Sequence, residues 1–167
     1  MKKKGLLILF ILFLCFSFVS CEEDKETEKT NTSKETEQVA TIKGETYEAE
    51  DFTMTIADGF SKMDIDGGVQ AYKGNDVIEV WVRGYNNTES DAEKGAENLS
   101  KNNDGTEVKK TQKFGLIFYY TTFEAFGNPQ TVYVGLINGK KIQIGIMGKD
   151  YQNNELLQGM FDSITFK

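Results

Sequence analysis

Two residue types limit the chemistry that this 167-residue chain can perform. The sequence contains no histidine, and its only cysteines are Cys15 and Cys21. The chain after Cys21 therefore lacks the groups for Ser-His-Asp and Cys-His catalysis, and for zinc or copper sites that need imidazole or thiolate. We expect no enzymatic activity, no cofactor and no metal. The remaining alternative is an enzyme that uses carboxylates alone, which needs two carboxylates that converge in a pocket.

The best candidate for carboxylate chemistry is the segment Asp64-Ile-Asp66-Gly67-Gly68, which Asn75 and Asp76 follow at the next predicted turn. Oxygen ligands of this kind suit calcium. The segment lacks the bidentate glutamate and the further ligands at fixed offsets that a calcium loop requires. We therefore interpret Asp64 and Asp66 as solvated turn residues. A calcium titration that leaves the melting temperature unchanged would exclude the alternative.

Aromatic residues are dense in the predicted strands of the folded part. They are Trp81, Tyr85, Phe118, Tyr119, Tyr120, Phe123 and Tyr133. The simplest interpretation is a hydrophobic core beneath the helices. The alternative is a partly open aromatic surface around Trp81 and Tyr85, flanked by Glu79 and Arg83, that binds an envelope protein, a peptide or a glycan.

The charge distribution argues against a nucleic-acid partner. Residues 44–167 contain 12 Lys or Arg against 19 Asp or Glu, and no basic stripe is visible. A domain of this sign repels phosphate-rich partners at long range.

The N-terminal residues 1–20 have the layout of a secretory signal peptide. Lys2, Lys3 and Lys4 precede an unbroken apolar run from Gly5 to Ser20. As a helix this run would be roughly 24 Å long, which is shorter than the roughly 30 Å hydrocarbon core of a bilayer. We expect the segment to be removed from the mature protein.

The segment Phe18-Val19-Ser20-Cys21 resembles the lipobox of bacterial lipoproteins. In that motif a small residue precedes a cysteine that is acylated and becomes the new N-terminus. Phe18 stands where leucine is usual, and Cys15 has no small residue before it. The resemblance implies that Cys21 carries acyl chains such as palmitate, at least two of them, which suffice for stable attachment to a membrane. The alternatives are an uncleaved signal anchor and ordinary cleavage that leaves a free thiol.

Residues 21–43 form the acylated cysteine and a charged linker. The sequence after Cys21, EEDKETEKTNTSKETEQVATIK, has almost no large apolar residue. Such a segment cannot bury enough surface to offset its ordering entropy, so we predict a disordered spacer. A solvated helix is the alternative, although Asn31-Thr32-Ser33 would interrupt it. The spacer gives the domain reach from the membrane.

Residues 44–167 have the length of one domain, and most of them show strand periodicity. Phe52, Met54 and Ile56 share one face of a predicted strand. Further predicted strands cover residues 62–65, 69–73, 77–85, 107–114, 116–126, 131–137, 140–147 and 164–166. Asn138-Gly139 is a strong hairpin signal that pairs Ile137 with Lys140. The segment 127–130 is predicted as the turn before that hairpin.

Two helices complete the predicted domain. Ser90 and Glu93 match a capping box, and the helix is expected to extend to about Lys101. Its thin apolar side consists of Ala92, Ala96 and Leu99. A second helix is predicted over residues 151–161. The fold class is therefore α+β, an antiparallel β-sheet flanked by helices.

The order of these elements resembles the PsbP-like fold. The resemblance covers residues 45–167 and depends on three features: Phe52-Thr-Met-Thr-Ile56 leading to Asp58-Gly-Phe60, the Asn138-Gly139 hairpin, and the closing helix with Phe161-Asp-Ser-Ile-Thr-Phe166. Ala57-Asp58 stands where that family commonly has proline. The fold is shared by a Ran-binding nuclear-import regulator and by small bacterial envelope lipoproteins. The resemblance implies an α-β-α sandwich and transfers no active site.

The sequence therefore predicts a lipid-anchored extracytoplasmic lipoprotein of a bacterial cell envelope, with a non-catalytic binding or accessory domain. The membrane is its first expected partner, through Cys21. The alternative function is an immunity or inhibitor-type lipoprotein that masks a membrane protein or a toxin. A pull-down from solubilised membranes would separate the two.

Overall fold

The computed structural model describes residues 42–167. The predicted signal peptide, Cys21 and most of the predicted linker lie outside these residues and remain predictions. Within the described residues, neither helix has the length and hydrophobicity that a membrane crossing requires.

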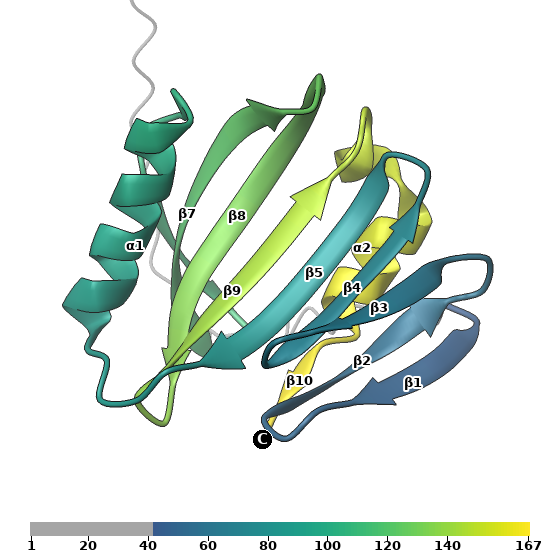
Figure 1. The fold of residues 1–167 in the computed structure, drawn as a ribbon, viewed down its shortest axis with the longest axis horizontal. Coiled ribbons are helices and arrows are strands. Elements are labelled where there is room, and N and C mark those ends of the chain that lie inside the picture. Colours follow the sequence, from purple (N-terminus) through teal and green to yellow (C-terminus); the bar gives the residue numbers. More distant parts are fainter. Residues whose placement is uncertain (1–41) are drawn as a thin grey trace, which may run out of the picture. The chain divides into compact units, whose positions relative to one another are not determined.

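A large antiparallel sheet of seven strands forms the centre of the domain (Figure 1). Its spatial order is β3-β4-β5-β9-β8-β7-β6. The strands are β3 (Ser61–Ile65), β4 (Gly68–Lys73), β5 (Asp76–Arg83), β6 (Lys109–Lys113), β7 (Leu116–Ala125), β8 (Asn128–Ile137) and β9 (Lys140–Met147). The predicted pairing of Ile137 with Lys140 is confirmed, so the Asn138-Gly139 turn sets the register between β8 and β9.

A second sheet contains three strands in the order β1-β2-β10. They are β1 (Gly44–Glu48), β2 (Phe52–Ala57) and β10 (Thr165–Phe166). The predicted face of β2 is confirmed, since Phe52, Met54 and Ile56 are all buried. The sequence did not indicate β1, whose residues are mostly exposed, and it placed every strand in one sheet. The second sheet exists because β10 pairs with β2 and not with the large sheet.

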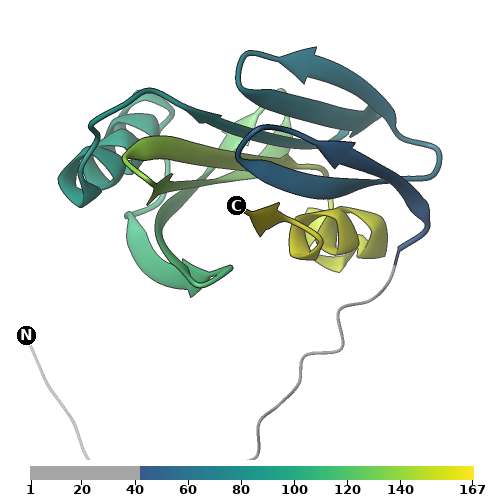
Figure 2. The same cartoon turned by 90° about the horizontal axis from the view of Figure 1, so that it is seen from below.

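Two α-helices cover opposite faces of the large sheet (Figure 1, Figure 2). Helix α1 (Glu89–Asn102) packs on β7 and β8, whereas α2 (Glu155–Asp162) contacts β2 and β5. The larger core lies on the α2 side, where Ile78, Val80 and Ile144 meet Leu157 and Met160. A smaller core lies under α1 and contains Ala92, Ala96, Tyr119, Val132 and Val134.

Three local predictions were wrong. The N-cap of helix α1 is Thr88, two residues before the predicted cap Ser90, because the Asp91 carboxylate accepts hydrogen bonds from the Thr88 backbone N–H (2.8 Å) and hydroxyl (2.7 Å). The predicted turn over residues 127–130 is the two-residue turn Phe126-Gly127, since Ala125 pairs with Asn128. The predicted helix over residues 151–161 is divided into a 3₁₀ turn η1 (Tyr151–Asn153) and α2, which Asn154 caps through its side-chain oxygen.

Candidate functional site

Strand β5 places three of the predicted site residues on one side of the large sheet. Ile78, Val80 and Val82 point into the core, so Glu79, Trp81 and Arg83 point to the opposite face. Helix α1 covers this face only at β7 and β8, and it leaves β5 open (Figure 1). Trp81 is half-buried there.

Arg83 connects Trp81 to the neighbouring turn between β3 and β4. Its guanidinium carbon lies 4.0 Å from the centre of the Trp81 ring, in a cation–π contact. The same guanidinium donates to the Asp66 carboxylate at 3.1 Å. Both charged side chains are well exposed, so the pair orients Arg83 more than it stabilises the fold.

Glu79 lies at the centre of a polar group on the open face. The Gln70 amide nitrogen is 3.4 Å from one Glu79 carboxylate oxygen, and the Gln143 amide nitrogen is 3.4 Å from the other. Gly145 lies beside Glu79, and a Cβ at that position would be 3.1 Å from the Glu79 side chain. The absent side chain at Gly145 thus gives Glu79 room to lie across the sheet.

A cavity of about 580 Å³ lies at the end of β5, next to Arg83. Its walls come from the β1–β2 turn, the β3–β4 turn, the end of β5 and the start of β9, and they include Tyr47, Asp51, Asp66, Arg83, Tyr85 and Lys140. Tyr85 stands at this cavity and is 80% exposed. The cavity therefore combines two tyrosines, two cations and their paired carboxylates.

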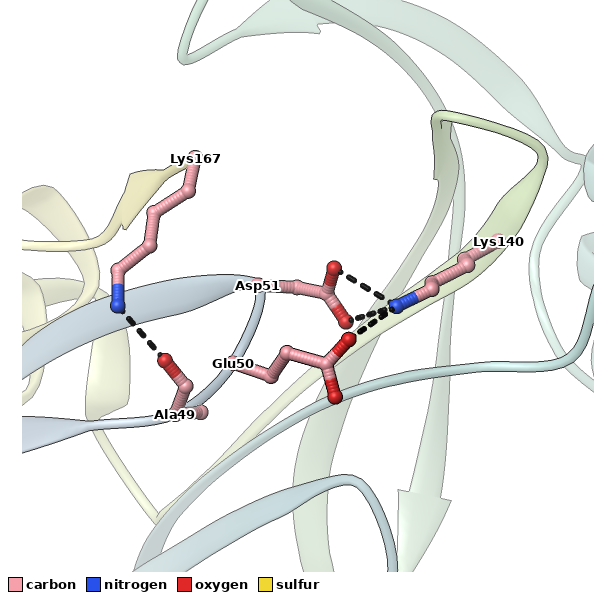
Figure 3. Close-up of polar contacts among 5 residues, drawn as sticks. All are labelled: Ala49, Glu50, Asp51, Lys140 and Lys167. Atoms are coloured by element: carbon pink, nitrogen blue, oxygen red, sulfur yellow. Dashed lines mark hydrogen bonds and ion pairs between the residues drawn. The ribbon is translucent and has the colours of Figure 1, made fainter.

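Lys140 is the most constrained charge in this cavity (Figure 3). Its Nζ lies 2.9 and 3.0 Å from the two Asp51 oxygens and 3.1 Å from Glu50. The hydrogen bond to Asp51 raises the pKa of Lys140, and the bond to Glu50 adds to this shift. These two carboxylates converge in a pocket, but the ammonium group of Lys140 binds both, which is the arrangement of a structural clamp.

The structure distributes the predicted site residues over two adjoining places. Glu79, Trp81 and Arg83 share the open face, whereas Tyr85 belongs to the cavity, and Arg83 lines that cavity as well. Among the other aromatic residues, Phe118 and Tyr119 are buried, which agrees with the core interpretation. Sequence reasoning missed Lys140 and Asp51, because no local pattern connects residues 89 positions apart.

The calcium alternative is not supported by the arrangement of its ligands. Asp66 lies in the β3–β4 turn and pairs with Arg83, whereas Asn75 and Asp76 lie at the other end of β4. The Asp76 carboxylate accepts a hydrogen bond from the Asn154 amide at 2.9 Å. Within residues 42–167, no three Asp, Glu, His or Cys side chains are placed to hold a metal ion.

Comparison with known proteins identifies the fold. Neither a protein-family model nor a curated protein sequence matches the chain. The solution structure of cyanobacterial PsbP (CyanoP) from Synechocystis sp. PCC 6803 superposes with a TM-score of 0.55 and 12% identity, over 74% of this chain and 92% of that chain. The domain has the PsbP-like α+β fold.

The PsbP-like domain also matches a protein from Bacteroides thetaiotaomicron VPI-5482. That superposition has a TM-score of 0.47 and 12% identity, over 70% of this chain and 45% of the other chain. At 12% identity the match to CyanoP concerns the fold alone, so the function of this PsbP-like domain has to be argued from its own surface.

Proposed function

We propose that this chain is a lipid-anchored extracytoplasmic protein whose PsbP-like domain binds a peptide segment of an envelope protein without catalysing a reaction. One observation carries the binding proposal: Arg83 stacks on Trp81 and also lines the cavity beside the exposed ring of Tyr85. Arg83 thus links the aromatic face to the cavity. We call Glu79, Trp81, Arg83 and Tyr85 together the Arg83 surface.

The residue types of the Arg83 surface favour a protein or peptide partner. Trp, Tyr and Arg are the residues most enriched among those that dominate protein interfaces. Arg83 is held in place by Trp81 and Asp66, so less side-chain entropy is lost when it binds. A glycan is the other outcome, because aromatic rings and planar amides such as Gln70 and Gln143 also suit sugars.

A matched pair of variants tests the Arg83 surface. The double variant Arg83→Ala, Tyr85→Ala removes two of its side chains. The control Tyr72→Ala, Lys73→Ala removes an exposed tyrosine and a cation at the other end of β4. In a pull-down from solubilised membranes with the full chain, we expect the first variant to lose the bound protein and the control to retain it. Equal capture by both variants, or binding of an oligosaccharide alone, would contradict the peptide proposal.

Trp81 provides a second readout, because it is the only tryptophan of the chain. Its half-buried ring should be quenched by acrylamide to an intermediate degree, and a bound partner should reduce this quenching. Trp81 quenching that is the same with and without the captured partner would place the interface elsewhere.

The lipid anchor is tested separately. Each acyl methylene buried in a membrane contributes about 0.8 kcal/mol, so a doubly acylated Cys21 would hold the protein in the membrane pellet. We expect Cys21→Ala to release the protein into the medium. Retention of Cys21→Ala in the pellet after a high-salt wash would exclude the anchor.

A further inference from the structure

Three hairpin turns of the large sheet have the same backbone conformation, but two begin with phenylalanine and one with asparagine. They are Phe114-Gly115 between β6 and β7, Phe126-Gly127 between β7 and β8, and Asn138-Gly139 between β8 and β9. The first residue of each turn has a φ of 53°, 52° and 49°, respectively, and each glycine has a φ between 72° and 75°. Asparagine tolerates this left-handed conformation, whereas a bulky residue adopts it at a cost.

Phe114 has a clear structural reason to occupy its turn. Its ring lies 5.1 Å from that of Phe161 in α2 and 5.8 Å from that of Phe166 in β10. The packing of these rings offsets the unfavourable backbone. Phe114 therefore stabilises the contact between the two sheets.

Phe126 has the same backbone conformation, but its ring has no stabilising packing contact within the described domain. Its side chain is 94% exposed, so the residue carries both an unfavourable φ and an apolar ring in water. The Asn128 amide donates to the Phe126 carbonyl at 3.0 Å, and this bond involves the backbone, not the ring. The exposed ring is therefore available for a contact outside the domain.

The first described residue, Ile42, lies beside α2. In the small sheet, Gly44 pairs with Ala57 at the open end of the β1–β2 hairpin. The turn of this hairpin is at its other end, beside Lys140, which follows the β8–β9 turn. Ile42 packs on Gly159 of α2, where a Cβ would lie 2.2 Å from the Ile42 side chain. Ile42 and Gln152 line one hollow, and Gln152 lines a second hollow with Thr122 and Pro129 of the β7–β8 hairpin. Gln152 thus connects Ile42, the first described residue, to the β7–β8 hairpin.

We propose that the Phe126-Gly127 turn inserts its aromatic ring into the interface of the membrane that holds the lipid anchor. This inference rests on the anchor of the proposed function. Interfacial apolar groups are buried about 5–10 Å into the boundary between headgroups and acyl chains. In this orientation the Arg83 surface, at the other end of the strands, faces away from the lipid and is open to a partner.

A lipid surface fits the turn better than a protein interface does. The tip residues Ala125, Phe126, Gly127 and Asn128 are uncharged, while the nearby Glu124, Lys149 and Asp150 are exposed. A stable protein interface buries about 800 Å² per partner, and the single ring of Phe126 has no surrounding apolar patch of that size. One ring binds lipid weakly by itself, but the tether keeps the domain at a high effective concentration next to the membrane.

Two tryptophan variants compare the two ends of β8. The full-length chain is expressed with its signal peptide, purified as the mature membrane form, and reconstituted into vesicles of phosphatidylcholine and phosphatidylethanolamine with brominated phosphatidylcholine. Phe126→Trp places a fluorescent reporter in the turn that is proposed to contact the membrane. Asn138→Trp places the same reporter in the matched turn at the other end of β8. Trp81 contributes the same background fluorescence to both variants. We expect bromolipid to quench the added tryptophan of Phe126→Trp about twofold or more strongly than that of Asn138→Trp.

A second measurement uses the wild-type protein. Phe126 and Tyr85 are both exposed sites for chymotrypsin, at opposite ends of the domain. Vesicles should slow cleavage after Phe126 and leave cleavage after Tyr85 at its rate in detergent. If Phe126→Trp does not fold, the ratio of these two cleavage rates still tests the membrane contact of Phe126.

Each outcome separates the two proposals. Protein that does not float with the vesicles disproves the anchor, and the membrane contact of Phe126 with it. Protein that floats, but shows equal quenching at both turns and equal protection at both cleavage sites, disproves only the Phe126 contact. Stronger quenching of Asn138→Trp would mean that the domain faces the membrane with its other end.

Discussion

Lys140 and Asp51 form an ion pair that joins the two sheets of the domain. The Lys140 Nζ is within 3.0 Å of both Asp51 oxygens, and each side chain is only 17% exposed. Asp51 lies in the β1–β2 turn and Lys140 begins β9, so the pair fixes the turn of the small sheet against the hairpin of the large one (Figure 3). It also forms one wall of the cavity beside Tyr85.

Removal of the Asp51 charge should weaken the domain measurably. Asp51→Asn leaves Lys140 largely shielded from water with a weaker partner, and we expect it to lower the free energy of unfolding by about 1–2 kcal/mol in urea denaturation. Glu50→Gln is the control, because Glu50 is 87% exposed and its ion pair with Lys140 should contribute less than about 0.5 kcal/mol. If Asp51→Asn and Glu50→Gln lowered the free energy of unfolding equally, the Asp51–Lys140 ion pair would not be the clamp between the two sheets. The raised pKa of Lys140 implies that its contribution is complete below pH 10.5 and is lost as the pH rises through the folded-state pKa.

The two Phe-Gly turns predict opposite results for the same substitution. Phe114→Asn removes a partly buried ring that packs on Phe161 and Phe166, so it should destabilise the domain by about 2 kcal/mol, less than the loss of a fully buried ring. Phe126→Asn removes an exposed ring and relieves its left-handed backbone, so stability should stay the same or increase slightly. Thermal denaturation of both variants measures the difference. A large loss from Phe126→Asn would mean that its ring has a structural role.

The observed start of α1 is testable by two neighbouring substitutions. Asp91→Ala removes both hydrogen bonds to Thr88, so it should cost about 1 kcal/mol of stability. Ser90→Ala, at the cap that the sequence suggested, should change stability by less than about 0.5 kcal/mol, because Ser90 is exposed in the first turn. Urea denaturation measures the loss of stability in each variant. A larger loss from Ser90→Ala than from Asp91→Ala would mean that Ser90 is the N-cap.

Tyr133 should make the domain sensitive to strongly alkaline pH. Burial raises its pKa from 10.0 to about 12, and nearby Tyr151 and Tyr120 add to the shift. Because the folded state holds this proton more tightly, the contribution is complete below pH 10.0 and declines as the pH rises towards about 12. Tyr133→Phe should reduce the slope of stability against pH in this window. An unchanged slope would assign the alkaline loss to other groups such as Lys140.

Local sequence patterns were sufficient for every strand except β1 and for the register of the Asn138-Gly139 hairpin. Alternation placed Phe52, Met54 and Ile56 on a buried face, and Asn138-Gly139 set the register of β8 with β9. These features depend on residues that are close in the chain. The pattern also predicted a capping box at Ser90 and Glu93, whereas the observed hydrogen bonds form between Thr88 and Asp91.

Contacts between distant segments were decided by the tertiary structure alone. No sequence pattern indicates that Asp51 meets Lys140, or that β10 pairs with β2 to form a second sheet. The Phe-Gly turns at 114 and 126 show the reason most directly. Both have the same residues and the same backbone, but α2 and β10 reach Phe114, whereas nothing in the domain covers the ring of Phe126. A local sequence therefore specifies the conformation of a turn, while its burial depends on which distant elements pack against it.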